Sequence, residues 1–65
     1  MKIILNGDAR DVRAVSLSAA LDELGFGGAV VATAVNGEFV AANARAAMLL
    51  AEGDALEVLA PMQGG

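Results

Sequence analysis

The pattern of apolar and polar positions predicts a strand at the start of the chain. Residues 1–5 are an apolar, β-rich run that ends at Asn6-Gly7-Asp8, a typical turn sequence. Val12 and Val15 predict a second, weaker strand after this turn. These segments together predict an N-terminal β-hairpin.

The period then changes from that of a strand to that of a helix. Four apolar residues fall on one helical stripe: Leu17, Ala20, Leu21 and Leu24. Ser16 is suited to the N-cap, where its hydroxyl accepts a backbone N–H. Gly25 is suited to the left-handed conformation that ends a helix, with Phe26 placed to fold back on the last turn. The pattern predicts a helix of two to three turns from Leu17 to Leu24.

The middle of the chain predicts a second hairpin. Residues 29–35 form a β-branched, almost wholly apolar run, which is typical of a strand covered on one face and flanked in the sheet. Asn36-Gly37 follows, the pair best suited to the positive φ angles of a type I′ turn, and residues 38–40 return as a strand. The alanine-rich residues 41–51 predict a short helix or helical turn.

The last predicted element is a half-buried strand that starts after a turn at residues 52–54. Leu56, Val58 and Ala60 alternate along it with Glu57 and Leu59. Because proline cannot donate to a sheet, the strand should end at residue 61. We expect residues 1–61 to form one domain and residues 62–65 a flexible C-terminal tail.

The order of hairpin, helix, hairpin, short helix and strand predicts a two-layer α+β domain. One main helix should pack across a mixed sheet of four or five strands. Because a helical crossover separates them, the first and last strands should be parallel neighbours at the centre of the sheet. The predicted core is Ile3, Leu5, Leu17, Leu21, Leu24, Val31, Val35, Leu50, Leu56 and Val58.

Composition excludes several classes of function. The 65 residues are 57% hydrophobic and 18% charged, which fits one small domain. The sequence has no Cys and no His, so it offers no thiol nucleophile, imidazole base, thiolate cluster or ordinary zinc site. Its net charge of −4 has the wrong sign for holding nucleic acid by the phosphates, so we expect no nucleic-acid partner.

The charges are unevenly distributed. The first 13 residues hold three basic and two acidic side chains, whereas Arg45 alone accompanies six acidic side chains after them. This acidic surface is either a solvated face or a docking site for a basic partner.

No apolar run reaches the length of a signal-peptide core or the ~18 residues that span a bilayer. We expect a cytoplasmic protein without a membrane partner.

Other candidate sites have simpler interpretations. Ser16 is explained as a helix cap, without the context of a phosphopantetheine attachment site, and Lys2 lies at a strand start instead of on the hairpin tip of a biotin or lipoyl domain. The carboxylates of Glu52, Asp54 and Glu57 belong to a turn and an outward strand position. Residues 25–28 end a helix instead of opening one, unlike a phosphate loop. We therefore expect no bound metal and no permanently bound cofactor.

The remaining chemical feature is the pair Gly64-Gly65 at the end of the sequence. A main-chain carboxylate that enters another protein's ATP site needs neighbours without Cβ, so that the backbone passes a narrow channel. Adenylation would turn the carboxylate into a substrate with AMP as a good leaving group, which a sulfur nucleophile displaces. The Gly65 carboxylate would become a thiocarboxylate, with Gly64 threading the channel.

The whole chain resembles the ThiS family, the sulfur carrier proteins of thiamine biosynthesis, which have the ubiquitin-like β-grasp fold. The resemblance is carried by residues 1–6 (MKIILN), 34–38 (AVNGE), 52–54 (EGD) and 56–65 (LEVLAPMQGG). The last segment is the most specific, because it covers the final strand and the tail without a gap.

The resemblance implies a protein carrier and co-substrate rather than an enzyme. It implies that a ubiquitin-activating-like enzyme of the ThiF type uses ATP to adenylate Gly65. A cysteine desulfurase relay then supplies sulfur, and a thiazole synthase of the ThiG type receives it. AMP and sulfur would be bound covalently and transiently on Gly65.

Two alternatives and one departure accompany this interpretation. The small subunit of molybdopterin synthase is similar in fold and also ends in Gly-Gly, and a non-catalytic ubiquitin-like interaction module with an incidental tail is a different class. Family members often have a Pro-Arg pair after the middle hairpin, where this chain has Ala41-Ala42. Arg45 is the nearby candidate for the missing charge.

The alternation of the last strand also predicts a docking site. Leu59 and Met62 are placed on the opposite side from Leu56 and Val58. An apolar pair beside the tail suits the anchoring of a partner, while the acidic surface steers it. We assign Leu59, Met62 and Gln63 as candidate partner-binding residues.

Overall fold

The computed structural model describes residues 1–60. The predicted domain end at residue 61 and the predicted tail, with Met62, Gln63, Gly64 and Gly65, lie outside the described residues. Residues 1–60 form the elements β1 (Lys2–Leu5), β2 (Asp8–Asp11), α1 (Leu17–Glu23), β3 (Ala32–Val35), β4 (Glu38–Val40), the 3₁₀ turn η1 (Ala42–Ala44) and β5 (Ala55–Leu59).

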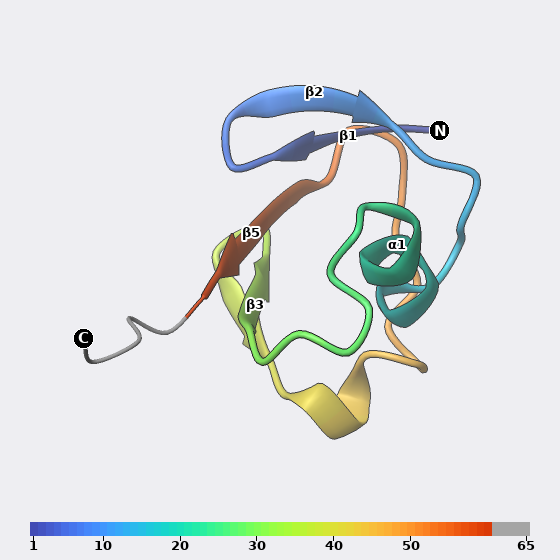
Figure 1. Cartoon of the computed structure of the whole chain (residues 1–65). Coiled ribbons are helices and arrows are strands. Elements are labelled where there is room, and N and C mark those ends of the chain that lie inside the picture. Colours follow the sequence, from blue (N-terminus) through green and yellow to red (C-terminus); the bar gives the residue numbers. More distant parts are fainter. Residues whose placement is uncertain (61–65) are drawn as a thin grey trace.

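The strands form one mixed sheet in the order β2-β1-β5-β3-β4 (Figure 1). β1 and β5 are parallel, with Leu5 opposite Leu56, and the other neighbours are antiparallel. Side chains from α1 and from the facing side of the sheet share one hydrophobic core. The α+β prediction is therefore confirmed, including parallel first and last strands with β5 at the centre, the arrangement of the ubiquitin-like β-grasp fold.

Helix α1 begins at Leu17, as predicted, and ends at Glu23, one residue before the predicted end. The Ser16 hydroxyl accepts a hydrogen bond from the Ala19 backbone N–H at 3.1 Å, which satisfies one free donor of the first turn. Gly25 has a φ of +95°, and the Phe26 N–H donates to the Leu21 carbonyl at 2.8 Å. The left-handed cap ends the helix. Glycine suits this position because a residue with a side chain would be strained at this φ.

The asparagines of two turns hold β5. Asn36 and Gly37 have φ angles of +51° and +84°, as predicted for a type I′ turn. The Asn36 carboxamide donates to Asp54 Oδ1 and accepts from the Ala55 N–H, both at 3.0 Å. On the other side of β5, the Asn6 carboxamide donates to the Val58 carbonyl at 3.1 Å and accepts from the Val58 N–H at 2.9 Å. β5 is thus fixed by side chains as well as by its neighbouring strands.

Asp54 should make the stability of the domain depend on pH in acid. The Asn36 side chain and then the Ala51 N–H donate to its carboxylate and lower its pKa below the usual 3.8. A carboxylate with a lowered pKa stabilises the fold above its unfolded pKa, and this contribution is lost as the pH falls through the folded pKa. We expect Asp54→Asn to flatten the fall in unfolding midpoint below about pH 4, measured by chemical denaturation. An unchanged pH profile would contradict this role.

Strand β2 corrects one prediction. The sequence predicted a strand through Val12 and Val15, whereas β2 runs from Asp8 to Asp11 and all four residues are exposed. Val12 lies just after the strand and is buried, while Val15 is exposed. Because β2 is an edge strand with neither face buried, its residues lack the alternation that marks a half-buried strand.

The middle of the chain is less regular than predicted. The strand expected from residue 29 begins only at Ala32, and Val30 is exposed. The short helix or helical turn predicted within residues 41–51 is the 3₁₀ turn η1 at its start. After η1 the chain makes further turns, in which the Ala47 N–H donates to the Ala44 carbonyl and the Met48 N–H to the Arg45 carbonyl. It also bonds to the start of α1: the Leu17 N–H donates to the Met48 carbonyl and the Leu50 N–H to the Val15 carbonyl, both at 2.8 Å.

Most of the predicted core is buried, but Leu24 and Val31 are only partly buried against it. The structure adds Val12, Ala20, Val40 and the polar Thr33. Thr33 is satisfied in the core because its hydroxyl donates to the Val40 carbonyl at 2.8 Å and accepts from Arg45 Nε at 3.0 Å.

Candidate functional site

Strand β5 leads toward the predicted tail and divides its side chains between two environments. Leu56 is fully buried and Val58 is 5% exposed, whereas Leu59 is 66% exposed. Glu57 is also exposed. The predicted alternation is confirmed for Leu56 to Leu59, whereas Ala60, predicted on the buried side, lies beyond β5 and is exposed. No helix or loop of residues 1–60 covers Leu59. The structure describes the chain only up to Ala60, so the functional roles assigned to residues 62–65 remain predictions.

An apolar surface surrounds Leu59 on the side of the sheet that α1 does not cover. Ala32 lies opposite Leu59, and Ala34 lies opposite Glu57 on one side and Phe39 on the other. Phe39 is 73% exposed and Val30 is 78% exposed. We define the open-face patch as Val30, Ala32, Ala34, Phe39 and Leu59.

The open-face patch contains two shallow hollows. One, of about 120 Å³, is lined by Ala32, Thr33, Ala34, Phe39, Glu57 and Leu59. The other, of about 310 Å³, is lined by Val30, Val31, Ala32, Leu59 and Ala60. Leu59 lines both hollows, so the predicted docking residue is also the centre of this apolar surface.

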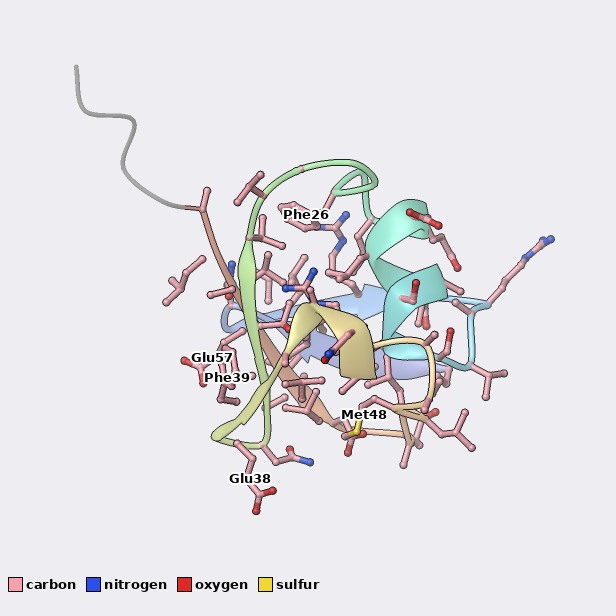
Figure 2. All side chains as sticks on the ribbon, turned by 90° about the horizontal axis from the view of Figure 1, so that it is seen from below. Phe26, Glu38, Phe39, Met48 and Glu57 are labelled. Carbon is pink, nitrogen blue, oxygen red and sulfur yellow. The ribbon has the colours of Figure 1, made fainter. Side chains whose placement is uncertain are left out.

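Phe39 and Val30 are parts of this surface that the sequence analysis missed. The sequence contains a signal for Phe39. Consecutive strand residues face opposite sides of a sheet, so an apolar Val40 that faces the core places Phe39 on the open side. Phe39 and Glu57, both labelled in Figure 2, line the same hollow. Val30 precedes β3, where a regular alternation does not apply.

Arg45 has a structural role in this fold. Its Nε donates to the Thr33 hydroxyl at 3.0 Å, and its Nη2 donates to the Val31 carbonyl at 2.6 Å. Thr33 is buried on the core side of β3. The guanidinium therefore holds the start of β3 from the core side, while the Leu59 side chain lies on the other side of the sheet.

The turn carboxylates are also used within the fold. Glu52 Oε1 accepts from the Lys2 N–H at 3.1 Å, and Asp54 Oδ2 accepts from the Ala51 N–H at 2.8 Å.

Over residues 1–60, no group of three or more carboxylates, His or Cys is arranged to hold a metal ion. In the same part of the chain, no helix has the length and apolar character needed to cross a membrane.

Comparison with known proteins decides the family. The sequence model of the ThiS family matches residues 3–65. This chain belongs to the ThiS family. The match runs from Ile3 in β1 to the two C-terminal glycines, and it confirms the family that the sequence segments indicated.

Two solved structures are similar to this ThiS-family chain over its whole length. One is a crystal structure of the thiamine biosynthesis protein ThiS from Geobacter metallireducens, with 30% identity, a TM-score of 0.84 and full coverage of both chains. The other is a solution structure of a thiamine biosynthesis protein from the same organism, with 29% identity and a TM-score of 0.80. This second match covers all of the present chain and 88% of the chain in the solution structure. No curated protein matches this sequence.

Proposed function

We propose that this chain is a sulfur carrier of thiamine biosynthesis and that the Gly65 carboxylate is the group that carries the sulfur. The observation that carries the proposal is the ThiS-family match, which runs through Gly64 and Gly65. Both similar structures come from proteins named for thiamine biosynthesis. The chain has no Cys or His, so its contribution to the chemistry is the tail and the surface that presents it.

The proposed chemistry takes place in a partner's ATP site. The Gly65 carboxylate attacks the α-phosphorus of ATP, pyrophosphate leaves, and an acyl adenylate forms. A persulfide of a cysteine desulfurase relay then attacks the carbonyl carbon, AMP leaves, and a thiol reductant cleaves the S–S bond of the resulting acyl disulfide. In the thiocarboxylate product one oxygen has been replaced by sulfur, which a thiazole synthase of the ThiG type receives.

The fold suits a domain that is held while its tail reacts. β5, the strand before the tail, is paired on both sides and fixed by the Asn6 and Asn36 side chains. Gly64 and Gly65 lack a Cβ that would block a narrow channel. The activating enzyme of the ThiF type would hold the domain through the open-face patch and leave the tail to enter its ATP site.

Leu59 should be an anchor for this docking. Its side chain is 66% exposed at the centre of the open-face patch, so Leu59→Asp puts a charge into the contact without opening the core. We expect the affinity for the activating enzyme to fall about 30-fold or more, the size of a hot-spot loss of 2 kcal/mol. Isothermal titration calorimetry measures the loss.

Leu49 provides the matched control, because it is also 66% exposed but lies beside the start of α1. Leu49→Asp should bind the activating enzyme as the unchanged chain does. Equal affinities for both variants, or a loss of folding in Leu59→Asp, would contradict the assignment of Leu59 to the docking surface.

The function is tested by supplying both possible acceptors. The chain is incubated with the activating enzyme, ATP and a sulfur donor, then divided between a thiazole synthase and the large subunit of molybdopterin synthase. We expect thiazole formation in the first reaction and no molybdopterin in the second. Sulfur transfer only to the molybdopterin enzyme would support that pathway, and absence of any adenylate would support an interaction module.

A further inference from the structure

A row of three side chains crosses the open face of the sheet beside Leu59. Glu57 on β5 lies opposite Ala34 on β3, and Ala34 lies opposite Phe39 on β4. Adjacent strands are about 5 Å apart, so the Glu57 and Phe39 backbones stand roughly 10 Å apart. The short side chain of Ala34 leaves the space between them open, and this space is the hollow of about 120 Å³.

Five carboxylates of residues 1–60 accept no hydrogen bond there, namely Asp8, Asp11, Asp22, Glu38 and Glu57, and Glu57 is the one that lines the hollow beside Leu59. Glu23 accepts hydrogen bonds from the backbone of Arg13, Glu52 from Lys2, and Asp54 from Ala51. Within the same residues Glu57 accepts none, and its neighbours in the hollow are alanines, Phe39, Leu59 and the inward-facing Thr33. A carboxylate without a hydrogen-bond partner among residues 1–60 thus lines an apolar hollow together with the exposed Phe39.

We propose that this hollow receives an arginine side chain of the activating enzyme, an inference that rests on the proposed function. The planar guanidinium donates to both oxygens of the Glu57 carboxylate. The same plane stacks on the exposed Phe39 ring, and the apolar stem of the arginine lies over Ala34 and Leu59.

The shape and charge of the groove favour this occupant over others. A volume of about 120 Å³ is below the roughly 300–1,000 Å³ of small-molecule sites, but one side chain can lie in it. The acidic charge of the chain after residue 13 has the sign that attracts a basic partner surface. Lysine would pair with Glu57 but lacks the flat face that stacks on Phe39.

The test measures binding of the full chain to the activating enzyme by calorimetry, together with the kinetics of adenylation. We expect Glu57→Gln to weaken binding about 10-fold and to raise the KM for the chain by a similar factor, since a charge-assisted pair is lost. Phe39→Leu, which keeps an apolar side chain but removes the ring, should weaken binding about 2- to 5-fold. Binding of the unchanged chain should weaken with added salt more steeply than binding of Glu57→Gln.

Asp22→Asn is the matched control. It removes the same charge from an exposed position on α1, in the other layer of the fold, and should change affinity by less than about twofold. Affinity of Glu57→Gln within about twofold of the unchanged chain, or an equal loss in Asp22→Asn, would overturn the arginine contact. Adenylation of the unchanged chain is followed in the same assay, so failure of the contact is distinguished from failure of the proposed function.

Discussion

A chain extended by one alanine after Gly65 should form no thiocarboxylate, and a chain that lacks Gly65 should form none either. The reacting group in our account is a main-chain carboxylate at a fixed distance from the docked domain. An added or missing residue moves that carboxylate away from the α-phosphorus of ATP, and misplacement by about 1 Å already costs about 100-fold in rate. The yield of thiocarboxylate after incubation with the activating enzyme, ATP and a sulfur donor measures the effect.

Substitutions beside and away from the tail provide the controls. Gly64→Val should also impair adenylation, because its side chain obstructs the channel that the tail must pass. Glu52→Gln changes a carboxylate that holds the Lys2 backbone and should leave sulfur transfer nearly intact. If the extended chain accepts sulfur as well as the original one, without trimming, the carrier mechanism is wrong and the interaction-module alternative replaces it.

The second large effect should come from the central strand. Leu56 is fully buried on β5, between β1 and β3, so Leu56→Ala leaves a cavity where two strand pairs meet. We expect a loss of about 2–5 kcal/mol in the free energy of unfolding. At about 0.05–0.15 kcal/mol per residue, a domain of this size has roughly 3–10 kcal/mol in total, so much of the stability would be lost.

Urea unfolding followed by circular dichroism measures this loss, with Leu59→Ala as the control on the same strand. Leu59 lies three residues further along β5 but points to solvent, so its truncation should change the free energy of unfolding by less than about 0.5 kcal/mol. Similar losses in both variants would contradict the division of β5 into a core side and a docking side.

The elements with strong local signals could be predicted from the sequence. Helix α1 has a capping serine, a single apolar stripe and a terminating glycine, and all three are used in the structure. The Asn36-Gly37 turn has the two positive φ angles that this dipeptide tolerates best. At these places local propensity and tertiary packing favour the same conformation.

Elements that depend on long-range contacts were predicted less well. β2 is stabilised by pairing with β1, and its own residues are all exposed, so no hydrophobic period indicates it. The alanine-rich segment after β4 has high helix propensity, but it forms only short turns, and its Arg45 and Met48 carbonyls accept from N–H groups at the start of α1. Burial of Thr33 likewise depends on Arg45, which is 12 residues away in sequence. These contacts join segments that are far apart in the sequence, so a local sequence pattern does not predict them.

The candidate site was predicted in part. Alternation placed Leu59 outward, and the structure confirms this exposure. Phe39 and Val30 were missed because their proximity to Leu59 depends on the order of β5, β3 and β4, which a single strand pattern does not contain. Glu57 was interpreted as a solvated carboxylate, and only the sheet register places it across Ala34 from an exposed ring.

The most direct test of the central claim is to locate the sulfur within the chain. The chain is incubated with the activating enzyme, ATP and a sulfur donor, and the intact product is then fragmented in a mass spectrometer. Our account predicts that one oxygen is exchanged for sulfur and that every fragment with the added mass contains Gly65. Sulfur on any other residue, or a product of unchanged mass after an adenylate has formed, would contradict it.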